Sequence, residues 1–87
     1  MQTLTIVILD HDINRIRICE NSVQKAVREL GLKAVITQIS EPPYLARKNV
    51  WEQLPVLEIN GLIWSRKSGQ AFSKGEVVSL LRNKYMQ

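Results

Sequence analysis

The sequence predicts a single α/β domain of 87 residues, in which helices flank a mixed four-stranded sheet. Within residues 3–39, an apolar run, an amphipathic segment and a second apolar run follow one another. This order is typical of a βαβ unit, whose crossover makes the two strands parallel. A proline-headed apolar segment then leads into Asn60-Gly61, the strongest short-range signal for a β-hairpin. A last amphipathic segment predicts a closing helix.

The βαβ unit rests on three segments. Residues 3–9 are rich in β-branched side chains and carry no charge, which favours a strand buried on both faces. Residues 13–30 are predicted to form a helix, which Asp12 or Asn14 could cap. Residues 33–39 form the second predicted strand. The helix has one apolar stripe at helical spacing, made by Ile16, Cys19, Val23, Ala26, Val27 and Leu30.

The second half adds the hairpin and the last helix. Residues 40–43, with two prolines, are expected to break the chain, and residues 44–53 to form a weak helix. Residues 55–59 and 62–65 are the predicted hairpin strands. Residues 73–76 read Ser-Lys-Gly-Glu, a capping box that predicts the start of the last helix. The predicted order is therefore β-α-β-(α)-β-β-α.

The composition limits the classes of function. There are 12 Lys and Arg against 8 Asp and Glu, a net charge of +4. The basic residues are scattered, so we expect solubility and weak electrostatics rather than a dedicated nucleic-acid interface. No apolar run reaches about 18 residues, so no membrane span is expected. The N-terminus lacks the features of a signal peptide, and a cytoplasmic location is expected.

Few residues are available for metal or cofactor chemistry. Cys19 is the single cysteine and His11 the single histidine, which excludes an intramolecular disulfide and a cysteine-rich zinc site. The triplet Asp10-His11-Asp12 could bind a metal weakly, but a solvated loop at a strand end is the preferred interpretation. We therefore expect no metal and no cofactor. Trp51 and Trp64 are expected to pack in the core or at its edge.

Three motifs carry a family resemblance. They are Lys-Ala-Val-Arg-Glu-Leu-Gly at 25–31, Leu54-Pro55-Val56-Leu57 with Asn60-Gly61, and Gly69 before Ser-Lys-Gly-Glu-Val-Val at 73–78. In this order and spacing the chain resembles the small thioredoxin-like proteins called redox-active disulfide proteins, over most of its length. The resemblance implies a thioredoxin-like fold. It also implies that Pro55, a candidate for a cis peptide bond, lies beside the active-site position.

The redox motif of that family is missing from this chain. Counted back from Glu29-Leu30-Gly31, its two cysteine positions fall on Ile13 and Ile16, so Ile13-Asn14-Arg15-Ile16 replaces Cys-x-x-Cys. Dithiol–disulfide exchange needs an attacking and a resolving thiol. The oxidoreductase activity of the family therefore does not carry over, and we expect a redox-inactive domain.

Cys19 leaves an enzymatic alternative open. A single thiol could serve a redox or glutathione-linked reaction, although a glutathione enzyme of this fold places its cysteine where Ile13 stands. Cys19 belongs to the apolar stripe of the helix, whereas a reactive cysteine is partly exposed near a cation or a helix N-terminus. An inert core thiol is the preferred interpretation.

The resemblance brings the helix start and the loop before Pro55 to one end of the sheet. The predicted partner-binding residues there are Ile13, Asn14, Arg15, Ile16, Leu54 and Pro55. An apolar centre with a basic rim is typical of a protein-binding surface. Alternatively, both isoleucines pack inward, or the helix N-terminal amides near Asn14 hold an anion with help from Arg15. The expected function is protein interaction or assembly, with oligomeric state left open.

Overall fold

The computed structural model describes residues 3–48, 50–66 and 69–86. Its elements are β1 (Leu4–Leu9), α1 (Ile13–Leu30), β2 (Ala34–Ile39), α2 (Pro42–Arg47), the 3₁₀ turn η1 (Trp51–Gln53), β3 (Val56–Ile59), β4 (Leu62–Ser65) and α3 (Lys74–Tyr85). The strands form one sheet in the order β2-β1-β3-β4. β1 and β2 are parallel, and the other two neighbouring pairs are antiparallel. The predicted α/β class with a mixed four-stranded sheet is confirmed.

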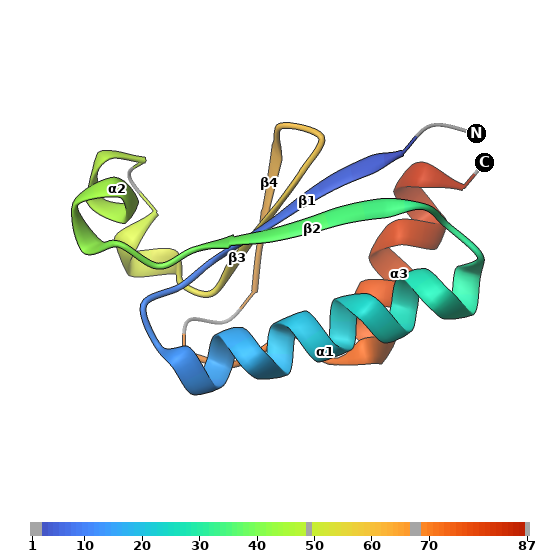
Figure 1. Cartoon of the computed structure of the whole chain (residues 1–87), viewed down its shortest axis with the longest axis horizontal. Coiled ribbons are helices and arrows are strands. Elements are labelled where there is room, and N and C mark those ends of the chain that lie inside the picture. Colours follow the sequence, from blue (N-terminus) through green and yellow to red (C-terminus); the bar gives the residue numbers. More distant parts are fainter. Residues whose placement is uncertain (1–2, 49, 67–68, 87) are drawn as a thin grey trace.

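The helices α1 and α3 lie side by side and cover one face of the sheet (Figure 1). Successive side chains of a strand point to opposite faces, so Leu4, Ile6 and Ile8 of β1 all face these helices. They are buried with Leu57 and Ile59 of β3 in the main hydrophobic core. The helices contribute Cys19, Val23, Ala26, Val77, Val78 and Leu81 to the same core.

The short helix α2 lies by the other face of the sheet, at the end where β1 stops (Figure 1). Leu45 of α2 packs there in a second buried cluster with Leu9, Val50, Leu54 and Val56. The cluster anchors the segment that leads into β3. Away from α2, this face of the sheet is more exposed to solvent.

The bounds of α1 agree with the prediction, and its two ends explain why. Of the two predicted caps, Asp12 is the one used: its carboxylate accepts hydrogen bonds from the backbone N–H groups of Asn14 and Arg15. At the other end, Gly31 has a left-handed backbone with φ of 67° and closes the helix.

The predicted hairpin is also present. Asn60 and Gly61 have φ of 50° and 86°, the left-handed pair that a two-residue primed turn requires. The Asn60 side chain accepts a hydrogen bond from the Thr5 N–H at 2.9 Å, which ties the turn to β1. The Leu54–Pro55 peptide bond is cis, as the sequence suggested.

The prediction for residues 40–53 is wrong in its boundaries. Residues 42–43 do not interrupt the chain but begin α2, because proline is well accommodated in the first helical turn, where the N–H groups have no helical partner. The predicted helix 44–53 is divided between α2, which ends at Arg47, and η1. The capping box at the start of α3 is present as predicted.

The start of β1 and the end of α3 lie at one end of the molecule, and α1 begins toward the opposite end (Figure 1). Within the part of the chain that the structure describes, no helix has both the length and the apolar character needed to cross a bilayer.

Candidate functional site

The end of the sheet where β1 stops brings several predicted site residues together. β1 and β3 are antiparallel, and Leu9 lies opposite Val56. The residue after Leu9 and the residue before Val56, Asp10 and Pro55, therefore lie at the same end of the sheet. The loop before α3 also comes here, since the Gly69 N–H donates to the Leu54 carbonyl at 3.0 Å.

A buried ion pair organises this end. The Asp10 side chain is completely buried, and its carboxylate accepts hydrogen bonds from Arg15 Nε at 2.8 Å and Arg15 Nη2 at 2.7 Å. It also accepts from the backbone N–H groups of His11 at 2.7 Å and Asp12 at 3.3 Å. The hydrogen bond to Asp10 raises the pKa of Arg15 above its usual value. The pair fixes the first turn of α1 to the end of β1.

Asp12 completes the turn into α1. Its Oδ1 accepts from the Asn14 N–H at 2.9 Å and the Arg15 N–H at 3.2 Å. These hydrogen bonds hold the pKa of Asp12 below its ordinary value of 3.8, and the one from Arg15 has the largest effect. The three side chains of the Asp10-His11-Asp12 triplet thus have different partners. Among the described residues, no group of three or more His, Cys, Asp or Glu side chains is placed to hold a metal ion.

The six predicted partner-binding residues divide into two groups. Ile13 is 67% exposed, Asn14 is exposed, and Arg15 is partly exposed. The other three, Ile16, Leu54 and Pro55, are buried beneath them. Of the two isoleucines at the family's cysteine positions, the first faces solvent and the second packs inward. Only the first three can therefore offer side chains to a partner.

An aromatic pair borders the exposed group. The rings of His11 and Trp51 lie 4.9 Å apart between centroids, tilted by 30°. Trp51 is 45% exposed, so of the two positions expected for it, in the core or at its edge, the core position is wrong. Trp64 packs against the main core. No local sequence signal indicates the aromatic pair, because its members are distant along the chain. We call the solvent-facing residues His11, Ile13, Asn14, Arg15 and Trp51 the α1-start surface.

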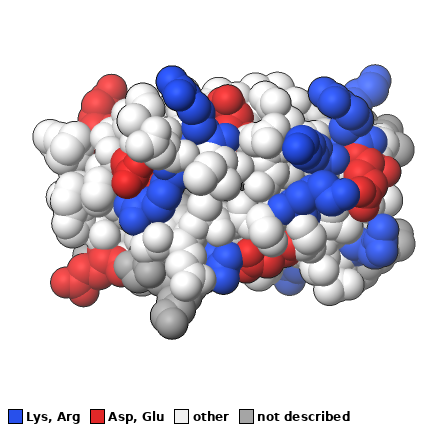
Figure 2. Space-filling model, turned by 90° about the horizontal axis from the view of Figure 1, so that it is seen from below, with Lys and Arg blue, Asp and Glu red and all other residues white. Residues whose placement is uncertain are grey.

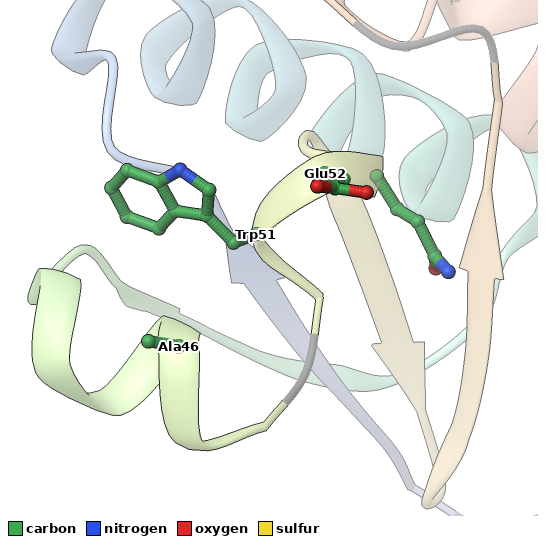
Figure 3. Close-up of a pocket in the computed structure, with 4 residues that line it drawn as sticks. Ala46, Trp51 and Glu52 are labelled. Carbon is green, nitrogen blue, oxygen red and sulfur yellow. The ribbon is translucent and has the colours of Figure 1, made fainter.

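A concavity adjoins this surface. It has a volume of about 500 Å³ and is lined by Ala46 of α2 with Trp51, Glu52 and Gln53 of η1. The indole of Trp51 extends from η1 to the side where α2 and Ala46 lie, and the Glu52 carboxylate is directed away from the indole (Figure 3). The concavity therefore combines an aromatic surface with a carboxylate and an amide.

Cys19 lies away from this end, in the core between the sheet and the helices α1 and α3. Its side chain is completely buried, and its Sγ accepts a hydrogen bond from the Phe72 N–H at 3.4 Å. Burial raises the pKa of the Cys19 thiol. A raised pKa and lack of access both oppose thiolate chemistry.

The positive charges do not gather in one unbroken patch on the face formed by α1 and α3. Lys and Arg side chains stand there beside acidic ones (Figure 2). One such contact is the Lys74–Glu29 ion pair at 2.7 Å. This mixed distribution differs from the continuous basic footprint of nucleic-acid binders.

No protein-family model matches the chain, and no curated protein matches it. The structural class of the chain is that of an α/β domain, with a mixed four-stranded sheet and three α-helices in the described residues.

Proposed function

We propose that the chain is a thioredoxin-like domain without thiol redox activity, and that it binds another protein through the α1-start surface. The expected role is that of an interaction or assembly module. The order of its helices and strands and the mixed sheet support the thioredoxin-like assignment. The position of Pro55, at the head of β3 and near the start of α1, agrees with the same resemblance.

Two features favour a redox-inactive domain. The family's cysteine positions are occupied by Ile13 and Ile16, which carry no thiol. The one cysteine, Cys19, is completely buried, and its pKa is raised by that burial. A thiol in this state is a poor nucleophile and a poor partner for disulfide exchange.

The exposure of Ile13 is the observation that carries the binding proposal. Single exposed apolar residues are common on protein surfaces. Ile13, however, is 67% exposed at the first residue of a helix whose start is tied to the end of β1 by the ion pair of Arg15 with the buried Asp10. The exposed part of Trp51 lies on the same end, and aromatic residues and Arg are enriched in the centres of protein interfaces.

Site-specific crosslinking tests the proposal. A photoreactive benzoylphenylalanine at position 13 of the full chain is expected to crosslink a partner in cells, whereas the same group at position 18 is not. Ile18 offers a matched control because it lies on the same helix and is 54% exposed. The captured protein is then purified for direct affinity measurements.

Calorimetry with the purified partner gives the second test. Ile13→Asp is expected to weaken binding by about tenfold or more, because it places an unpaired charge in the centre of the interface. Ile18→Asp is expected to bind like the unmodified chain. Equal weakening by both substitutions, or unchanged binding by Ile13→Asp, would contradict the proposal. Leu54→Asp is unsuitable as a test, since Leu54 is 2% exposed and the charge would unfold the second core cluster.

A further inference from the structure

The strand β4 is an edge of the sheet with exposed apolar side chains on both of its faces. It pairs with β3 and with no other described strand. Leu62 is 49% exposed and Ile63 is 47% exposed, and successive side chains of a strand point to opposite faces. Residues 62–65 contain no charged residue and no proline. Such residues commonly protect an edge strand from pairing with another chain, so β4 lacks this protection.

The backbone of β4 also has hydrogen-bonding groups for one further strand. In an antiparallel pair, every second residue directs its N–H and C=O toward the neighbouring strand, and the residues between them direct theirs away. Ile59 and Leu62 close a two-residue turn and therefore face each other. It follows that Ile63 and Ser65 direct their backbone groups to the open edge, where an added strand can donate and accept hydrogen bonds.

The opposite edge of the sheet, β2, is less suited to such pairing. Val35 is 54% exposed there, but the other exposed residues of this strand are Thr37 and Gln38, whose side chains are polar. The remaining apolar residues of β2 are partly covered. β4 is thus the edge at which pairing covers exposed apolar side chains on both faces.

We propose that two copies of this chain pair through β4, antiparallel about a twofold axis at Ile63. A second copy is the occupant that the strand itself defines, because this symmetry matches the outward backbone groups of β4 with the same groups of an identical strand. Ile63 of one copy then lies opposite Ile63 of the other, on the face away from α1 and α3. On the face that these helices cover, Leu62 of each copy lies opposite Trp64 of the other.

The pairing joins two four-stranded sheets into one. Four residues of each copy take part, and the contact is expected to bury less than the roughly 1,200 Å² of a standard interface, so association should be reversible. Ser65 lies opposite Val56, which lies opposite Leu9, at the end where β1 stops. Antiparallel pairing therefore directs the two α1-start surfaces to opposite ends of the dimer. The dimer itself does not depend on the proposed function of that surface.

Sedimentation velocity of the full chain tests the pairing. The weight-average sedimentation coefficient is expected to rise from that of a monomer toward that of a dimer between about 10 µM and 1 mM. Ile63→Lys is expected to remain monomeric over this range, because it places like charges opposite each other. Val35→Lys makes a similar change on β2 and is expected to dimerise like the unmodified chain. Circular dichroism checks that both variants are folded.

Amide hydrogen exchange locates the contact in the unmodified chain, so it does not depend on the folding of a variant. The N–H groups of Ile63 and Ser65 are expected to exchange more slowly as the protein concentration is raised, because pairing protects them from solvent. The amides at the exposed edge of β2 are the internal control. Their exchange rates are expected to be independent of concentration.

Five results would overturn the inference. The first three are a monomer at all concentrations, an unchanged dimer in Ile63→Lys, and equal loss of the dimer in Ile63→Lys and Val35→Lys. The fourth is exchange of the Ile63 and Ser65 amides that does not depend on concentration. The fifth is a series of species larger than a dimer, since pairing of β4 with β2 would continue from copy to copy. All these measurements are made without the partner protein, so failure of the dimer and failure of the proposed function, tested with Ile13→Asp, can be distinguished.

Discussion

At the scale of single residues, the buried carboxylate of Asp10 has the largest structural role at the candidate site. It accepts hydrogen bonds from the Arg15 guanidinium and from the backbone N–H groups of the two residues that follow it. Removing one partner of a buried pair leaves an uncompensated charge, which costs more than the pair itself contributes. The position of the first turn of α1, where Ile13 lies, therefore depends on this contact.

Loss of the guanidinium should destabilise the domain strongly. We expect Arg15→Met to lower the free energy of unfolding by about 3 kcal/mol, the lower end for a broken buried pair, because Arg15 is partly exposed and Asp10 keeps its two backbone donors. Urea denaturation measures the change. Arg17→Met, at an exposed position of the same helix, should cost no more than about 0.5 kcal/mol. Equal effects of the two substitutions would contradict the structural role given to the pair.

The environment of Cys19 predicts its reactivity. Because the thiol is buried and its pKa is raised, iodoacetamide should modify it in the native domain far more slowly than in the urea-unfolded chain. The two rates are compared by mass spectrometry at the same pH. Rapid, stoichiometric modification of the native domain would instead favour the single-thiol enzyme.

At the scale of elements, the ends of the helices depend on local capping. Ser73 accepts a hydrogen bond from the Glu76 N–H at 3.2 Å, and the Glu76 carboxylate accepts from the Ser73 N–H at 3.0 Å. Both bonds satisfy N–H groups that have no partner inside α3. Glu76 also pairs with Arg66, so the cap connects the helix to the end of the hairpin.

Removal of this cap tests its contribution. Ser73→Ala should lower the free energy of unfolding by about 1 kcal/mol, the usual cost of losing a serine N-cap. Ser79→Ala changes an exposed serine inside the same helix and should be nearly neutral, since alanine is the better helix former. Thermal or urea unfolding measures both, and a cost at position 79 equal to that at position 73 would refute the capping argument.

The same elements show how much the sequence alone could predict. α1 and the hairpin were predictable because their signals are local: a helical apolar stripe, a cap and Asn-Gly. The start of α2 was missed because two prolines were interpreted as a break, although they also suit a first helical turn. Burial of Leu54 and the contact between His11 and Trp51 depend on residues brought together only by folding, so no local pattern indicates them.

At the scale of the whole molecule, the two faces of the sheet differ. One is covered by α1 and α3 and holds the main core, whereas the other is covered by α2 only at the end where β1 stops. The candidate site lies at this end, where the second core cluster, η1 and the start of α1 are found. Buried packing and the exposed side chains of Ile13 and Trp51 are thus found at the same end of the sheet.

Two surface carboxylates contribute to the stability of the molecule in acid. The pKa of Asp12 is lowered by backbone hydrogen bonds, mainly by the one from the Arg15 N–H. The pKa of Glu29 is lowered by its hydrogen bond with Lys74. A lowered folded-state pKa means that the ionised carboxylate favours the folded state. This contribution is complete above the ordinary values of 3.8 and 4.5 and is lost as the pH falls through the lower folded-state values.

We therefore expect the urea concentration at the unfolding midpoint to be lower at pH 3 than at pH 6. These two conditions lie on either side of the pKa values. The decrease should be smaller in the double variant Asp12→Asn and Glu29→Gln, because neither replacement side chain titrates. Unfolding curves at both pH values measure the effect. If the urea midpoint of the double variant decreased by as much as that of the unmodified chain, groups other than Asp12 and Glu29 would be responsible for the acid sensitivity.

The placement of the start of β1 and the end of α3 has a practical consequence. β1 begins and α3 ends at one end of the molecule, away from the start of α1 (Figure 1). An affinity tag or a fused fluorescent protein attached beyond β1 or beyond α3 would therefore be joined at the end of the molecule away from Ile13 and would leave Ile13 accessible.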